Sequence, residues 1–298
     1  MDQAADLTAS DTIDEPELCQ EVINQAKCPA VTTYDRRLVR QRPHLFTEDV
    51  IRDRDFRKMV LRDNFPIPGD DFREGYHEGS DISYWLNGLI SYLKTLNTLE
   101  HYNFQVSSML DFGCASGRVT RHFRCQMDDV TVWAADINPK HIRWLRTHIP
   151  RNPRAVPVTE TPGLPIADNS LDFVCGYSVF THIDETEIGW LAELRRILRP
   201  EGMAYLTVHN DDTWRAMANE DPSNRLLASM LRREGFTVER LHQPIPDGKT
   251  CFYFADEGYR AQVFHSNRYL RDVWGQFFII RDILPCEQQR QSVVVMTK

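Results

Sequence analysis

Apolar residues recur with two different periods along the chain, and the period changes near residue 105. Between Ser83 and Tyr102 they recur every three or four positions, which predicts one long amphipathic helix. The same spacing in shorter stretches over residues 34–65 predicts short amphipathic helices, and the prolines and glycine within 66–69 interrupt it. We therefore expect residues 31–104 to form an N-terminal helical cap.

Residues 1–30 lack a regular apolar pattern of this strength. Seven carboxylates lie between Asp2 and Glu21 against a single lysine at position 27, and the stretch is poor in aromatic residues. A segment of this composition buries too little apolar surface to offset the entropy lost on ordering. Residues 1–30 are predicted to be an acidic tail.

After residue 105, short apolar runs alternate with helical patterns. This alternation predicts right-handed crossover connections and a parallel sheet covered by helices, an α/β fold. The predicted strands are 106–112, 130–135, 154–158, 171–177 and 203–208, and the predicted helices between them are 117–124, 139–148 and 185–198.

The stretch 211–265 interrupts the alternation and is predicted to be an insertion. It contains one helical pattern at 223–234, a loop rich in proline, glycine and aspartate, and aromatic runs at 251–254 and 263–264. The alternation then resumes with a helix over 267–274 and strands over 277–284 and 292–297, which are close enough to form a hairpin. We expect a seven-stranded, mostly parallel sheet with one antiparallel strand.

Composition excludes several classes of protein. The chain has 298 residues, of which 42% are hydrophobic, but no apolar run approaches the roughly 20 residues of a membrane span. The formal net charge of −8 disfavours a globally basic nucleic-acid binder. Seven scattered cysteines without a CxxC pair, and the lack of a signal-peptide pattern, favour a reducing compartment. We therefore expect a cytoplasmic protein with neither a membrane nor a nucleic-acid partner.

Candidate chemistry gathers where the first two predicted strands end. The first strand ends in Asp111 and a turn with small residues at 113, 115 and 117, which allow the backbone to approach a ligand closely. The helix that follows offers unpaired N–H groups. The second strand ends in Asp136, whose carboxylate can accept two hydrogen bonds from ribose hydroxyls. Open parallel sheets bind ligands at this edge.

Two nucleotide ligands compete for this turn. A dinucleotide site needs Gly-x-Gly-x-x-Gly, and the spacing from Gly113 to Gly117 does not match it. An S-adenosylmethionine site needs an acid followed by a glycine-rich turn, and Asp111-x-Gly113-x-Ala115-x-Gly117 fits apart from the alanine. A turn that binds no ligand is the alternative, and Asp136 on the next strand weighs against it.

Residues 107–210 resemble a class I S-adenosylmethionine-dependent methyltransferase. Four stretches carry this resemblance in order: 110–117 as the glycine-rich motif, 135–138 as the ribose motif, 164–172 as the lead into the fourth strand, and 194–202 as the turn before the fifth. Residues 178–182 and 190–194 are similar to a bacterial subgroup linked to glycan or secondary-metabolite biosynthesis. The resemblance implies a Rossmann-like methyltransferase domain over 105–298 and S-adenosylmethionine as cofactor.

The resemblance also implies roles for single residues around the cofactor. Alanine at 115 adds only a methyl group to the usual glycine, so it does not preclude binding. The residues implied to surround the methionine part of the cofactor are Asp111, Gly113, Cys114, Ala115 and Gly117. Asp136 is implied to bind the ribose, and Ile137, Glu160 and Thr161 are implied to lie at the adenine. The backbone carbonyls of Gly176 and Tyr177 are implied to face the methionine amine.

Three histidines are candidates for catalysis. His182 follows the fourth strand, and its ordinary pKa of about 6.5 suits a general base; a helix-capping or core histidine is an equal alternative. His209 follows the fifth strand, and His265 precedes the late helix. Residues 209–212 could bind a divalent metal, but a polar loop is the favoured interpretation, so we predict no metal site.

These patterns together predict an S-adenosylmethionine-dependent methyltransferase that methylates an oxygen of a small-molecule or sugar-bearing metabolite in a biosynthetic pathway. The cap and the insertion 211–265 are expected to build the acceptor pocket. Two alternatives stay open: a catalytically silent cofactor-binding partner subunit, or an N- or C-methyltransferase acting on a small molecule or protein. The oligomeric state is not predicted.

Overall fold

The main sheet forms because its strands are apolar and are buried on both faces. The computed structural model describes residues 56–75, 80–149, 153–218, 231, 235, 237–253, 261–288 and 290–298. The predicted acidic tail 1–30, the first part of the predicted cap, and most of the helix predicted over 223–234 lie outside these residues.

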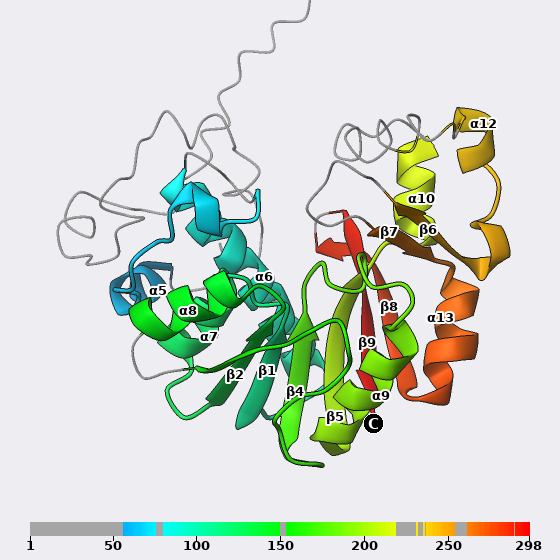
Figure 1. Cartoon of the computed structure of the whole chain (residues 1–298). Coiled ribbons are helices and arrows are strands. Elements are labelled where there is room, and N and C mark those ends of the chain that lie inside the picture. Colours follow the sequence, from blue (N-terminus) through cyan, green and yellow to red (C-terminus); the bar gives the residue numbers. More distant parts are fainter. Residues whose placement is uncertain are drawn as a thin grey trace, which may run out of the picture.

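Seven strands form this sheet in the order β3-β2-β1-β4-β5-β9-β8 (Figure 1). Strands β1 to β5 pair in parallel, and β9 is antiparallel to both of its neighbours. The predicted Rossmann-like fold with one antiparallel strand is therefore confirmed. The strands are β1 Ser108–Phe112, β2 Thr131–Asp136, β3 Arg154–Pro157, β4 Leu171–Gly176, β5 Leu198–Val208, β8 Ile279–Gln288 and β9 Gln291–Thr297.

Helices cover both faces of the sheet, because successive strand residues point to opposite sides. On one face Met109 packs with α6 and α7, and on the other Leu110 packs with α9 and α13. The helices of the described chain include α5 Phe56–Arg62, α6 Asp81–His101, α7 Thr120–Gln126, α8 Pro139–His148, α9 Glu187–Ile197, α10 Asp211–Ala218, α12 Val238–Leu241 and α13 Asn267–Val273. None that the structure describes is both long and apolar enough to cross a membrane.

The helical cap is joined to the domain by a buried ion pair. Arg121 of α7 and Asp63, which follows α5, are both fully buried and pair with each other, and the indole N–H of Trp85 in α6 also donates to Asp63 at 2.6 Å. Burial by itself raises the pKa of Asp63, but the contacts with Arg121, His122 and Trp85 together outweigh it and lower that pKa to about 2. Three helices are thus held together by one carboxylate.

Two elements begin three or more residues away from the start that the sequence predicted. Helix α7 begins at Thr120 rather than 117, since the preceding turn keeps a left-handed backbone as far as Gly117. Strand β5 begins at Leu198 rather than 203, because the expected turn is a bulge within the strand, with φ of 63° at Glu201. Neither difference moves the carboxyl end of its neighbouring strand.

The insertion contributes a second sheet, formed by β6 Lys249–Tyr253 and β7 Ala261–His265. Figure 1 shows it, with α10 and α12, on the side of β5, β8 and β9. The backbone N–H of Val263 donates to the carbonyl of Thr181 at 2.8 Å, and His265 N–H donates to the carbonyl of His209 at 2.9 Å. The hairpin therefore docks on residues that follow β4 and β5.

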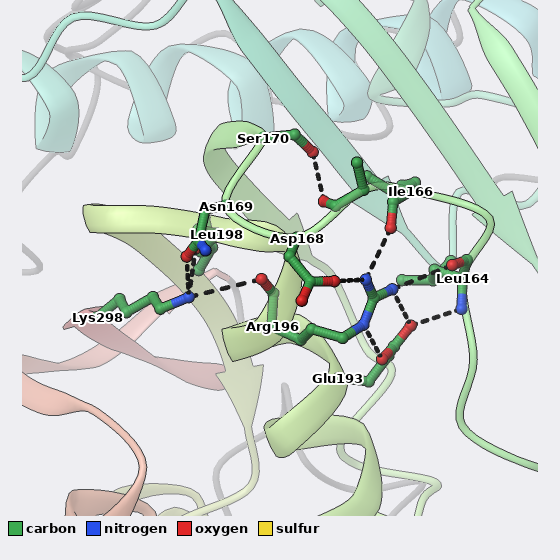
Figure 2. A network of polar contacts seen from close by, with 10 residues as sticks. Leu164, Ile166, Asp168, Asn169, Ser170, Glu193, Arg196, Leu198 and Lys298 are labelled. Carbon is green, nitrogen blue, oxygen red and sulfur yellow. Dashed lines mark hydrogen bonds and ion pairs between the residues drawn. The ribbon is translucent and has the colours of Figure 1, made fainter.

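One arginine anchors the loop between β3 and β4 (Figure 2). The guanidinium of Arg196, in α9, pairs with Glu193 at 2.7 Å and Asp168 at 2.5 Å, and it donates to the carbonyls of Leu164 and Ile166. Glu193 in turn accepts from the Leu164 N–H at 2.6 Å. These contacts join the loop stretch 164–172 to the helix-end stretch 194–202.

Candidate functional site

The glycine-rich turn after β1 is tied to the end of β2. The N–H groups of Gly113 and Cys114 both donate to the carbonyl of Ala135, at 2.8 and 3.0 Å. Gly113 and Gly117 have φ of 73° and 82°, and a side chain at 113 would place its Cβ 2.2 Å from Val179. Ala115 adopts φ of 44°, a left-handed conformation that costs a non-glycine residue roughly 1–2 kcal/mol. The turn keeps this shape despite the alanine.

Asp136 is the last residue of β2 and is 5% exposed. Its two carboxylate oxygens accept hydrogen bonds from the N–H groups of Ala115, at 2.7 Å, and Asn138, at 2.8 Å. Each carboxylate oxygen can accept more than one hydrogen bond, so both retain capacity for a ligand hydroxyl. Burial raises the pKa of Asp136. Ile137 beside it is a large apolar side chain left 46% exposed.

Asp111, at the end of β1, is turned toward the start of α7. Its carboxylate is 1% exposed and accepts from the hydroxyl of Thr120 at 2.5 Å. Burial raises the pKa of Asp111 to about 6. This carboxylate therefore holds strand and helix together, and its predicted contact with the cofactor's methionine part stays a prediction.

The remaining predicted cofactor residues lie on neighbouring loops. Gly176 is the last residue of β4, and the hydroxyl of Tyr177 lies 2.5 Å from that of Thr95 in α6, so only the backbone of Tyr177 could serve a ligand at the sheet edge. Cys114 is buried, whereas Glu160 and Thr161 are exposed in the loop after β3. Their roles toward adenine stay predictions.

His182 lies after β4 and is half-buried. Its Nδ1 lies 2.8 Å from the carbonyl oxygen of Ala261, in the insertion. A carbonyl only accepts, so Nδ1 carries the proton and, in the neutral ring, Nε2 carries the lone pair. The other interpretation, a helix-capping or core histidine, is equally compatible with this contact.

His209 lies at the end of β5 and is 6% exposed, with its ring stacked on Phe264 of β7. Burial lowers the pKa of His209 to about 3, and the nearby charge of His182 when protonated adds to this. A ring that stays neutral and is packed against an aromatic side chain suits a structural role better than a proton shuttle. The structure brings His182 and His209 together through β7.

Sequence reasoning missed a polar cluster built on Glu187, the first residue of α9. This carboxylate is 1% exposed and accepts from Lys249 at 2.6 Å and Trp274 at 2.5 Å, while His265 lies 3.0 Å away. Burial by itself raises the pKa of Glu187, but the contacts with His265, Lys249 and Trp274 outweigh it and lower that pKa to about 2. His265, a lesser catalytic candidate, is thus part of the attachment of the hairpin. The sequence carried one signal for this cluster, because Glu187 lies on the apolar side of the helix predicted over 185–198.

The polar stretch after β5 caps helices. The side-chain oxygen of Asn210 accepts from Asp212 N–H at 3.1 Å, and Asp211 accepts from the N–H of Asn267 at 2.7 Å. Among the residues that the structure describes, no group of three or more histidine, cysteine or acidic side chains is arranged to hold a metal ion. The favoured interpretation of this stretch as a polar loop agrees with these contacts.

The part of the chain that forms this edge of the sheet matches a known protein family. A family model described as "Methyltransferase domain" matches residues 110–206, which run from the glycine-rich turn to the end of β5. Residues 110–206 therefore form a methyltransferase domain, of the kind that the resemblance to the class I S-adenosylmethionine-dependent methyltransferases implied. Its cofactor is therefore S-adenosylmethionine.

Two curated proteins are similar to this chain over part of their length. The malonyl-[acyl-carrier protein] O-methyltransferase of Methylococcus capsulatus is 26% identical over 156 residues, 48% of this chain and 56% of that protein. The protein of the same name from Hahella chejuensis is 28% identical over 94 residues, 32% of this chain and 33% of that protein. The chain thus spans about half the length of the first relative and about a third of the length of the second.

A solved structure shows the same fold. A protein from Pyrococcus horikoshii OT3 aligns with a TM-score of 0.50 at 15% sequence identity, covering 76% of this methyltransferase and 94% of that chain. At this identity the likeness concerns the fold alone.

The residues at the sheet edge fit S-adenosylmethionine. A buried carboxylate, Asp136, lies beside Ile137, an apolar side chain that is left exposed, as the ribose and adenine of the cofactor require. The left-handed turn at 113–117 brings backbone close to the same carboxylate through the Ala115 N–H. The methyltransferase would hold the adenosine at Asp136 and Ile137 and the amino-acid end at the turn.

Proposed function

We propose that this methyltransferase methylates an oxygen atom of a small biosynthetic metabolite and that His182 is its general base. The hydrogen bond from His182 Nδ1 to Ala261 carries the proposal, because it leaves the lone pair of the neutral ring on Nε2. The position of His182 in the loop after β4, on the edge that also carries Asp136, supports the assignment.

In this proposal the protein contributes alignment and proton transfer. S-adenosylmethionine supplies the electrophilic methyl group. Transfer to a hydroxyl oxygen is an in-line displacement, so the cap and the insertion hold the acceptor in line. His182 Nε2 accepts the hydroxyl proton, and the carbonyl of Ala261 keeps the ring oriented as that proton arrives.

A carboxyl group is a second candidate acceptor, favoured by the names of the two curated relatives. A carboxylate is already a nucleophile at neutral pH and needs no base, but it benefits from a cation. Lys249, on the docked hairpin, is paired with Asp184 at 2.8 Å and Glu187 at 2.6 Å. These two carboxylates offset the positive charge of Lys249, which would otherwise attract a carboxylate acceptor. The described contacts therefore favour the hydroxyl acceptor.

The two acceptor classes predict different pH dependence. Release of S-adenosylhomocysteine is to be measured with hydroxylated aromatic and sugar-bearing compounds, and with malonyl thioesters, from pH 5.5 to 9. The proposal expects turnover of a hydroxyl acceptor that rises through the histidine range. Turnover of carboxylates alone, independent of pH, would support the second candidate. Cofactor binding with no turnover across the panel would favour the silent partner subunit.

A cytoplasmic location is part of the proposal. The cysteines support it, because Cys114, Cys125, Cys175 and Cys251 are all free thiols, the first three buried as small apolar side chains. The proposed partner is a small-molecule acceptor, and the acidic net charge continues to disfavour nucleic acid.

A further inference from the structure

A hydrogen-bonded chain links the helical cap to the glycine-rich turn. The Glu74 carboxylate, in the loop before α6, accepts from Nε2 of His141, and Nδ1 of His141 lies 2.6 Å from the hydroxyl of Ser116. His141 is fully buried and Ser116 is 1% exposed. Since the carboxylate takes the Nε2 proton, the neutral ring accepts the Ser116 hydroxyl proton at Nδ1. Ser116 lies between Ala115 and Gly117, inside the turn.

Glu74 belongs to a short segment, residues 70–75, which we call the strap. Its middle part packs on α8: the ammonium of Lys140 donates to the Asp71 carbonyl at 2.9 Å and lies 4.4 Å from the centre of the Phe72 ring. Its other side is attached to the cap, because Arg73 is 4% exposed, donates to the Pro68 carbonyl and pairs with Asp81 at the start of α6. The strap therefore joins the cap to the cofactor edge.

The strap contacts both elements that would hold the cofactor. Through His141 it reaches the turn, and the side-chain amide of Asn138 donates to Glu74 at 3.3 Å. The backbone N–H of Asn138 donates to Asp136. Glu74, which is half-buried, thus lies close to the buried carboxylate of Asp136, and two neighbouring negative charges repel each other. The backbone of Glu74 is also left-handed, with φ of 50°, which adds local strain.

We propose that Glu74 is a positioning residue for the cofactor, which acts through His141 and Ser116 on the backbone of the glycine-rich turn. A carboxylate that fixes the imidazole also fixes the Ser116 hydroxyl, and thereby the turn between Gly113 and Gly117. The strap retains bound cofactor, so its contacts slow cofactor release. This inference rests on the cofactor site at Asp136 and not on the identity of the acceptor or on His182.

The experiment measures S-adenosylhomocysteine binding to the full chain by calorimetry and its dissociation by stopped flow. Glu74→Gln removes the charge that holds His141, and Ser116→Ala removes the far end of the chain while leaving the strap in place. We expect each to raise the dissociation rate about five- to twentyfold, and circular dichroism at the assay temperature is to show that both variants are folded. Asp71→Asn, an exposed carboxylate in the same strap, is the matched control and should bind as the wild type does.

The double variant Glu74→Gln/Ser116→Ala separates a linked chain from two independent contacts. If Glu74 acts through Ser116, the double variant releases the ligand no faster than the stronger single variant. Multiplied effects, or wild-type dissociation rates in both single variants, would overturn the inference. A wild-type chain that does not bind S-adenosylhomocysteine would instead refute the cofactor site, so the two failures are distinguishable.

Discussion

His182 and Ala261 are 79 positions apart in the sequence, yet the Nδ1 of the first lies 2.8 Å from the carbonyl oxygen of the second. The contact joins the loop after β4 to the first residue of β7. The insertion therefore does more than cover the sheet edge: one of its carbonyls sets which nitrogen of the candidate base carries the proton.

Replacing His182 tests its role as base. His182→Ala should lower the turnover of a hydroxyl acceptor about 10²–10⁴-fold, the usual contribution of a general base. Affinity for S-adenosylmethionine should stay within a few-fold, because the residue serves the acceptor. The ascending limb of the pH–rate profile should disappear. A modest loss of activity with the limb retained, together with a lower Tm, would mark His182 as a structural histidine instead.

Lys249 tests whether the hairpin positions the base. Lys249→Met removes the pairing with Asp184 and Glu187 and should loosen β7, including Ala261. We expect a lower kcat and a displaced pH limb with unchanged affinity for S-adenosylhomocysteine. Lys249→Arg keeps the charge and should restore most of kcat and the position of the limb. Equal losses in both variants would show that the charge is not what positions the hairpin.

Asp136 should decide cofactor affinity. Asp136→Ala removes charge-assisted hydrogen bonds, each worth about 1.5–3 kcal/mol, so S-adenosylmethionine should bind at least tenfold more weakly in a calorimetric titration. The Ala115 and Asn138 N–H groups also lose their acceptor, so circular dichroism must show that the variant is folded. Asp129→Ala, an exposed carboxylate before the same strand, is the matched control. Wild-type affinity in Asp136→Ala would refute the ribose assignment.

Two buried histidines should make the protein sensitive to mild acid. Burial lowers the pKa of His122 and of His209 from 6.5 to about 3 in each case. Below pH 6.5 the unfolded chain protonates both rings while the folded chain keeps them neutral. The stability that they contribute is thus complete above pH 6.5 and is lost as the pH falls toward 3.

The free energy of unfolding is to be measured in urea between pH 7.5 and 5. The expected slope is close to zero near pH 7.5 and approaches about 1.4 kcal/mol per pH unit for each histidine below about pH 5.5. His122→Gln, which cannot titrate, should remove one histidine's share of the slope. An identical slope in wild type and variant would show that His122 is protonated in the folded protein.

Local signals explain the elements that the sequence predicted well. Helix α8 has the predicted bounds, 139–148, because Asn138 caps it through Lys140 N–H at 3.0 Å and Pro139 occupies its first turn. The cofactor edge was predictable for a related reason. Parallel strands have their carboxyl ends at one side of the sheet, so the strand ends at Asp111 and Asp136 had to meet there.

Contacts between distant segments could not be predicted in this way. Glu74 and His141 are 67 positions apart, and neither belongs to a spacing pattern that points to the other. The same is true of Glu187 and Lys249, whose pairing attaches the hairpin. Such side chains meet because the sheet and its helices place them together, and a single sequence carries no periodic signal for that.

The sequence by itself determined the alternation of strands and helices, the glycine-rich turn and the edge at which a cofactor binds, because these follow from residue periodicity and from the conformations that glycine, proline and capping residues allow. Only the tertiary structure decided that Tyr177 points to Thr95, that the insertion orients His182 through Ala261, and that a strap from the cap reaches Ser116. These relationships depend on packing and hydrogen bonding between segments brought together by folding, and they exist only once the chain has folded.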